Sequence, residues 1–112
     1  MSISANPNSP LPANRYIRIA VFRHSFFQVY EKNGEQRYPD DTACYRFKNP
    51  VYGSIGSIDM GEGVAYCQLF SSETCEGNVL EMTLWSQVNL DEKRARSIRC
   101  YPFGAPIPLD SK

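Results

Sequence analysis

Hydrophobic and polar positions alternate along several short stretches of this chain. In residues 17–22 an isoleucine or a valine stands at every second position. Because successive side chains of a strand point to opposite faces of its sheet, this pattern predicts a strand with one buried face. Similar patterns predict about eight short strands, at residues 17–22, 26–31, 43–48, 54–60, 64–70, 78–84, 88–90 and 97–101.

Between these strands the sequence has one clear turn signal and one weak helix signal. Asn33-Gly34 favours a tight turn after the second strand, since both residues tolerate a positive φ. Helical signals are poor, and only residues 90–96 could form one helical turn, with Asp91 as its N-cap.

Six of the eight prolines lie near the two ends of the chain. Proline has no backbone N–H and resists central strands. The length of 112 residues fits one domain. We therefore expect an extended N-terminal tail at 1–15, a single domain at 16–102 and a C-terminal tail at 103–112.

The chain also carries an internal repeat. Ser57-Ile58 and Ser97-Ile98 lie about forty residues apart, a spacing that points to two copies of one supersecondary unit. Upstream of each Ser-Ile pair an aromatic residue opens a predicted hairpin: Phe22-x4-Phe27-x-Val29 in the first half and Phe70-x4-Cys75-x-Gly77 in the second.

These motifs resemble the βγ-crystallin Greek-key motif. In that motif an aromatic residue, four residues, a second aromatic, one residue and a glycine fold a hairpin over itself, and a strand beginning Ser-Ile closes the unit. The second copy departs from it at Cys75, and the first has Val29 in place of the glycine. The strings at residues 67–70 and 97–101 are also similar to small secreted fungal proteins of this type.

The resemblance implies an all-β fold, in which two Greek-key motifs form one βγ-crystallin-like β-sandwich. The repeats would span about 16–61 and 62–102. The apolar residues that would then form the core are Ile17, Ile19, Val21, Ile58, Leu69, Leu80, Met82, Leu84, Val88 and Ile98.

Many domains of the resembled type bind calcium through two Asn or Asp residues, two spacers, a Ser or Thr and a final Ser. In the window ending at Ser97, Lys93 and Arg96 stand where oxygen donors are needed. The window ending at Ser57 has no carboxylate. Because calcium needs several oxygen ligands at once, we expect no calcium here, and no other cofactor.

The cysteines bear on the cellular compartment. Cys44, Cys67, Cys75 and Cys100 form an even set in a short chain, which favours a secreted protein with two disulfides in one of three pairings. Residues 1–14 lack the apolar core of a signal peptide. The alternatives are a signal that was removed, or a cytoplasmic protein if the sequence has its native N-terminus.

Charge limits the partners that we expect. Twelve basic residues balance twelve acidic ones, whereas a nucleic-acid binder usually carries a basic excess. No apolar run is long enough to cross a bilayer. A local basic cluster of Lys93, Arg94, Arg96 and Arg99 could touch a phosphate, an anionic lipid or an acidic partner. We favour a solvated strand edge instead.

No catalytic constellation is evident. His24 is the single histidine and lies in a predicted hairpin loop, where a solvated imidazole is ordinary. Cys67 and Cys75 are too far apart for a zinc knuckle. We therefore predict no catalytic residues, no metal site and no enzyme activity.

Three functions remain as hypotheses. The first is a small secreted, disulfide-stabilised, non-enzymatic binding protein of effector, antimicrobial or toxin-like, or inhibitor type. It would be a monomer or weak dimer whose loops contact a protein or cell-surface partner. The second is a structural or stress-related crystallin-like protein, and the third an enzyme with an unrecognised site. The loop residues that would act in the first case are His24, Ser25, Glu73, Glu76, Trp85, Gln87, Lys93, Arg94 and Arg96.

Overall fold

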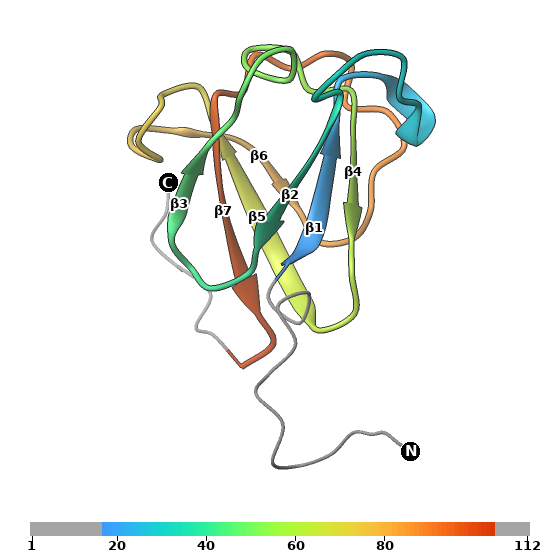
Figure 1. Cartoon of the computed structure of the whole chain (residues 1–112). Helices are drawn as coiled ribbons and strands as arrows, with labels where there is room; N and C mark the ends of the chain where they lie inside the picture. The colour runs from blue at the N-terminus through green and yellow to red at the C-terminus, as the bar shows by residue number, and fades with distance from the viewer. Residues whose placement is uncertain (1–16, 105–112) are drawn as a thin grey trace, which may run out of the picture.

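A computed structural model describes residues 17–104, which form an all-β fold (Figure 1). The predicted tails at 1–15 and 103–112 lie outside this range, apart from residues 103 and 104. The helix of the described part has only three residues, so no helix there could span a membrane. The elements are β1 (Ile17–Phe22), the 3-10 helix η2 (Ser25–Phe27), β2 (Glu35–Pro39), β3 (Cys44–Arg46), β4 (Ser57–Met60), β5 (Val64–Phe70), β6 (Val79–Thr83) and β7 (Ser97–Pro102).

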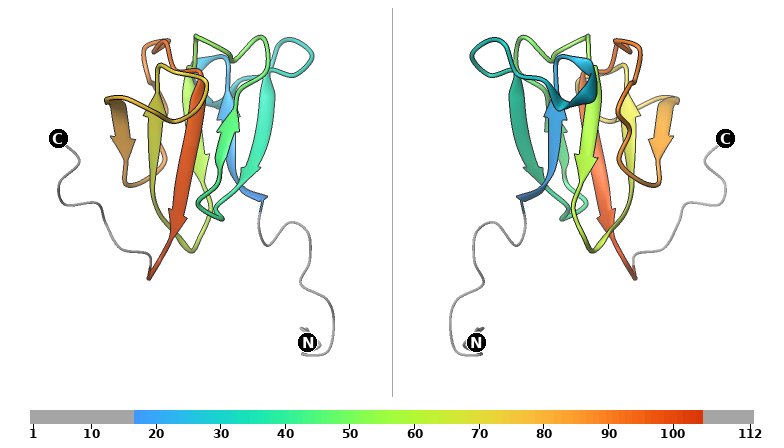
Figure 2. Two further views of the ribbon diagram at one scale, coloured as in Figure 1. Left: turned by 90° about the vertical axis from the view of Figure 1, so that its left-hand side faces the viewer. Right: turned by 90° about the vertical axis from the view of Figure 1, so that its right-hand side faces the viewer.

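The strands form two antiparallel sheets. One has the order β2-β1-β4 and the other β3-β7-β5-β6. Figures 1 and 2 show the two sheets packed as a sandwich, with the long loops gathered at one end. This is the β-sandwich of two Greek-key motifs that the sequence predicted.

The two repeats exchange a strand. β3 belongs to the first repeat but pairs with β7 of the second, with Tyr45 opposite Ile98. In return, Gln87 of the second repeat pairs with Ile58 of β4 through backbone hydrogen bonds of 2.9 Å in both directions. Each sheet is therefore completed by a segment from the other repeat.

The core lies between the sheets. Five of the predicted core residues are at most 1% exposed: Ile19, Val21, Ile58, Leu69 and Ile98. The side chain of Ile17 is outside the description. Phe47, Val51 and Ile55 are equally buried, although they were not predicted, because the loop after β3 folds down between the sheets.

On β6 the predicted buried face is wrong. Thr83 is buried, whereas the three predicted core residues are 36–50% exposed: Leu80, Met82 and Leu84. Leu69 of the core pairs with Glu81, and paired residues of a ladder share a face, so Glu81 and Thr83 point inwards. Val88 is also exposed rather than in the core. An alternating pattern identifies the two faces of an edge strand but does not say which one is covered.

Three local predictions are also wrong. Residues 26–31 form no strand, because Phe26 and Phe27 adopt positive φ values of 57° and 60°. The turn at Asn33-Gly34 is present, with Asn33 at φ 64°, but it leads into β2. Residues 88–90 form no strand. Residues 90–96 form no helical turn, since Asp91 and the residue after it adopt left-handed conformations.

A buried serine ties the first hairpin over the end of its sheet. The Ser57 hydroxyl donates a hydrogen bond to the His24 carbonyl (2.7 Å) and accepts one from the Phe27 N–H (3.1 Å). The Gly56 N–H bonds the Phe22 carbonyl at 2.7 Å. The rings of Phe22 and Phe27 also pack together, with centroids 5.4 Å apart.

The second hairpin has the same tie. The Ser97 hydroxyl donates to the Ser72 carbonyl (2.7 Å) and accepts from the Cys75 N–H (3.0 Å). The Arg96 N–H bonds the Phe70 carbonyl at 2.7 Å. The first repeat departs further from the Greek-key motif than the second, yet both have the same hydrogen-bonding scheme. The Ser-Ile pair identifies this scheme in the sequence.

Both disulfides involve the second sheet. Cys67–Cys100 links directly paired residues of β5 and β7. Cys44–Cys75 links β3 to the second hairpin, which explains why a cysteine replaces the second aromatic there. The described residues contain no free cysteine. In the chain-entropy account, a disulfide that closes a loop of this length stabilises the fold by about 3–4 kcal/mol, because it restricts the unfolded chain.

We predict that Ser97→Ala lowers the free energy of unfolding by about 1–3 kcal/mol, because the Cys75 N–H and the Ser72 carbonyl lose their partner. Urea unfolding under oxidising conditions measures the change. Ser71→Ala is the matched control, since Ser71 is exposed and its hydrogen bond to Arg96 uses its backbone carbonyl, which the substitution keeps. An equal effect of the two substitutions would contradict the stabilising role of the Ser97 hydroxyl.

Candidate functional site

Two cavities lie at the loop end of the sandwich, one beside each hairpin. We call the first the His24 cavity; its volume is about 530 Å³, and it is lined by His24, Ser25, Phe26, Gln28, Tyr30, Gly56, Asn89, Asp91 and Glu92. The second, the Tyr52 cavity, has about 320 Å³ and is lined by Arg46, Phe47, Lys48, Asn49 and Tyr52.

The internal repeat relates the two cavities. The Leu90 N–H bonds the Gly56 carbonyl at 2.7 Å, and the Phe47 N–H bonds the Arg96 carbonyl at 2.9 Å. Gly56 and Arg96 both directly precede the tying serines. Residues 89–92 therefore hold the position in the first cavity that residues 46–49 hold in the second.

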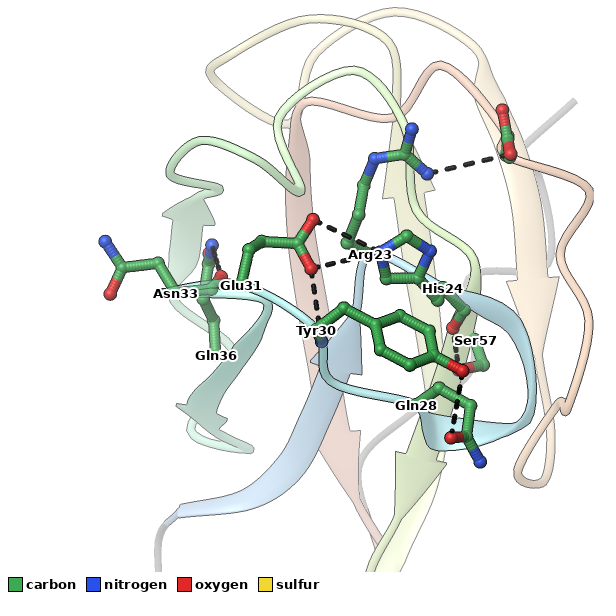
Figure 3. A network of polar contacts seen from close by, with 9 residues as sticks. Arg23, His24, Gln28, Tyr30, Glu31, Asn33, Gln36 and Ser57 are labelled. Atoms are coloured by element: carbon green, nitrogen blue, oxygen red, sulfur yellow. Dashed lines mark hydrogen bonds and ion pairs between the residues drawn. The ribbon is translucent and has the colours of Figure 1, made fainter.

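A polar network shapes the His24 cavity (Figure 3). The His24 Nε2 atom lies 3.0 and 3.2 Å from the two carboxylate oxygens of Glu31. The His24 ring meets the Tyr30 ring edge-on, with centroids 4.9 Å apart. The Tyr30 N–H donates to Glu31, and its hydroxyl donates to Gln28, both at 3.3 Å. These contacts hold the loop after η2 in one conformation.

The contacts of this network involve few groups of the kinds used in catalysis. Among residues 17–104, the hydrogen-bond partner of the His24 ring is the Glu31 carboxylate. In the same range no three His, Cys, Asp or Glu side chains converge to hold a metal ion. The described residues are thus compatible with a small non-enzymatic protein.

Exposed apolar side chains surround the His24 cavity. Phe26 is 60% and Tyr30 72% exposed, and Val29 and Val88 are also exposed. The Phe26 N–H donates to the Val88 carbonyl at 2.7 Å, which joins the two loops. We call Phe26, Val29, Tyr30 and Val88 the apolar rim of the cavity.

The Tyr52 cavity has a different character. The Tyr52 hydroxyl donates to the Glu73 carboxylate, and Arg46 Nε lies 3.5 Å from the same carboxylate. The guanidinium carbons of Arg46 and Arg96 lie 5.2 and 5.5 Å from the centre of the Tyr52 ring. Such distances allow cation–π attraction. Arg96 is held further by a hydrogen bond to the Ser71 carbonyl (3.2 Å).

The buried amide of Gln36 connects the loops that carry the two cavities. Its Nε2 donates to the carbonyls of Asn33 (2.9 Å) and Lys48 (2.8 Å). Its oxygen accepts from the Lys48 N–H (3.0 Å) and from the Tyr38 hydroxyl (2.6 Å). Burial raises the pKa of Tyr38 to about 12, so this phenol remains a hydrogen-bond donor well into the alkaline range.

The structure separates the predicted loop residues. His24 and Ser25 line the first cavity, and Glu73 and Arg96 each contact Tyr52, which lines the second. The other predicted loop residues lie in neither lining: Glu76, Trp85, Gln87, Lys93 and Arg94. Among these, Gln87 extends the first sheet, and Trp85 is 67% exposed.

The two calcium windows of the sequence lie at these cavities. Lys93 of the second window pairs with Glu81 at 3.5 Å, and Arg96 lies over Tyr52. In the first window, a Cβ atom on Gly56 would come within 2.4 Å of the His24 backbone. That position therefore has no room for the serine or threonine of the calcium motif.

Sequence reasoning missed Glu31, Tyr30, Arg46 and Tyr52. The segment 26–31 was assigned to a strand, which hid its place in a loop. Arg46 and Tyr52 are distant in sequence from Arg96, and only the exchange of β3 between repeats brings them together. No local motif could have identified the cluster.

The carboxylate of Glu73 raises the pKa of Tyr52 above its usual value, chiefly by accepting the phenolic hydrogen bond. We predict that Glu73→Gln lowers the pKa of Tyr52, because the phenolate would no longer face a negative charge. Alkaline titration followed by NMR of the tyrosine rings measures it. Tyr45 is the control: desolvation and then its hydrogen bond to Asp41 raise its pKa to about 12, and this pKa should not change. An unchanged Tyr52 pKa would contradict the hydrogen bond between Tyr52 and Glu73.

No protein-family profile matches the chain, and no curated protein sequence matches it either. Three solved structures do. The βγ-crystallin domain of Abundant Perithecial Protein from Neurospora crassa, in its Ca²⁺-bound form, has a TM-score of 0.62 and 10% identity, covering 94% of this chain and 100% of that one.

The N-terminal domain of protein S has a TM-score of 0.59 and 18% identity, covering 80% of this chain and 99% of that one. Hahellin, a βγ-crystallin, has a TM-score of 0.55 and 12% identity, covering 81% and 98%. At these identities the likeness concerns the fold. Together with the two serine-tied hairpins and the exchanged strand, it establishes that this chain has a βγ-crystallin-like fold.

Proposed function

We propose that this chain is a small secreted, non-enzymatic binding protein that recognises a partner through the loops around the His24 cavity. The observation that carries this proposal is the apolar rim. Aromatic side chains exposed beside a cavity are typical anchors of protein recognition, where they fill pockets of the partner. Effector, toxin-like and inhibitor roles all use such a surface.

Hydrogen bonds and ring packing hold the loop that carries the apolar rim. Ser57 fixes the ends of the first hairpin, and Glu31 fixes the His24 ring against Tyr30. A loop held in its binding conformation loses little conformational entropy when a partner binds. The large exposed side chains of the rim therefore project from a loop that is already held in place.

Two features support secretion. Both pairs of cysteines lie at disulfide distance, and such bonds persist in oxidising compartments. The core of so short a chain is small, so the crosslinks contribute a large share of its stability. We therefore expect the native protein to contain no titratable thiol. Four free thiols in the freshly purified protein would overturn secretion.

We predict saturable binding of the fluorescently labelled protein to at least one member of a panel of intact cells, immobilised glycans and proteases. Tyr30→Ala should weaken this binding by about tenfold or more, as expected for a buried aromatic anchor. Flow cytometry or surface plasmon resonance measures it.

Phe103→Ala is the matched control. Phe103 is 72% exposed, like Tyr30, but follows β7 at the opposite end, where its N–H bonds Gly63. It should bind like the wild type. Equal losses in both variants would assign the binding to another surface. Failure against the whole panel would favour the structural role.

A further inference from the structure

We propose that the Tyr52 cavity binds the phosphate or sulfate group of a small organic anion. This site is separate from the apolar rim and does not depend on the function proposed above. Its basis is that Arg46 and Lys48 line this cavity and that Arg46 and Arg96 both lie over the Tyr52 ring, which also lines it.

Positive charge is in excess at this place. Arg46 and Lys48 line the cavity, and Arg96 lies over the ring that forms its wall. Among the described residues, Glu73 is the carboxylate that contacts this group. Three cations thus face one anion, in a chain whose formal net charge is zero. Such an imbalance attracts anions into the cavity.

The guanidinium groups are oriented before any ligand arrives. Arg46 turns its Nε toward Glu73, and Arg96 turns one amino group toward the Ser71 carbonyl. Both guanidinium groups also lie near the Tyr52 ring. A guanidinium carries five N–H donors, so most of them remain for a ligand. Arginines that already make such contacts lose less side-chain entropy on binding an oxyanion than arginines without them.

The donor set suits a tetrahedral oxyanion better than a carboxylate. A phosphate or sulfate ester offers three free oxygens to two guanidinium groups and the Lys48 ammonium, whereas a carboxylate offers only two. The volume of about 320 Å³ lies at the lower end of small-molecule pockets. It leaves room for an organic group attached to the phosphate or sulfate.

The repeat supplies an internal comparison. The His24 cavity holds Asp91 and Glu92 in the place where the Tyr52 cavity holds Lys48 and Asn49. The same backbone frame thus presents carboxylates in one repeat and cations in the other. Anion binding should therefore be confined to the second cavity.

The test is an NMR titration of the ¹⁵N-labelled protein with inorganic phosphate, glucose 6-phosphate and glucose 6-sulfate, at neutral pH and constant ionic strength. We expect saturable shifts of the backbone amides at 46–49, 51–52 and Arg96, with no saturable shifts at 89–92. Lys48→Gln and Arg46→Gln should each weaken glucose 6-phosphate binding by about tenfold or more, the loss of a charge-assisted hydrogen bond.

Glu73→Gln gives the sharpest outcome. Glu73 repels an incoming anion and competes for Arg46, so its neutralisation should tighten binding several-fold. Arg94→Gln is the control, because Arg94 is exposed and, unlike Arg96, is not among the arginines that lie over the Tyr52 ring. The Arg94→Gln variant should bind glucose 6-phosphate as tightly as the wild type.

Lys48 projects an exposed side chain, so its substitution does not threaten folding. Shifts that never saturate would overturn the proposal, as would equal affinities of Lys48→Gln, Arg94→Gln and the wild type. If inorganic phosphate binds as tightly as both esters, the organic part of the proposed ligand is wrong and the site takes the free ion.

Discussion

One buried hydroxyl at the start of each closing strand determines the form of the loop end. Ser57 and Ser97 each join a carbonyl and an N–H of a hairpin that would otherwise leave its sheet. Because these polar groups are shielded from water, no solvent bond can fully replace the hydroxyl. The hairpins stay folded over the sandwich, and the cavities lie where they do, because of this contact.

On that shared frame the two cavities have diverged in charge and surface. The His24 cavity has a histidine–glutamate pair, two acidic residues and exposed aromatic rings. The Tyr52 cavity has arginines around Tyr52, and the hairpin beside it has a disulfide in place of aromatic packing. Gln36 joins the two loop systems through hydrogen bonds in the interior. The backbone scheme thus tolerates opposite electrostatics, because the tying atoms belong to serine and to the main chain.

The sequence predicted the fold class, the repeat and the cysteine crosslinks, since these depend on local signals such as Ser97-Ile98 and the alternation in β1. The predictions from sequence were wrong where tertiary contacts determine the local structure. Leu80 and Leu84 face solvent because the register with β5 turns Thr83 inwards. Phe26 looked like a strand residue, yet the Ser57 tie places its segment in a loop. The Tyr52 cluster joins residues from both repeats, and no pattern within either one could reveal it.

The exchanged strand makes the two halves of the chain inseparable. β3 completes the sheet of the second repeat, and Gln87 extends that of the first, so neither half possesses its own full sheet. Cys44–Cys75 then crosses between the halves as a covalent bond. A protease that cut the exposed turn at Glu62 would release no fragment, because interleaved strands and the crosslink would still hold both pieces together. Outside a cell, where proteases are abundant, a nicked molecule of this design keeps its shape.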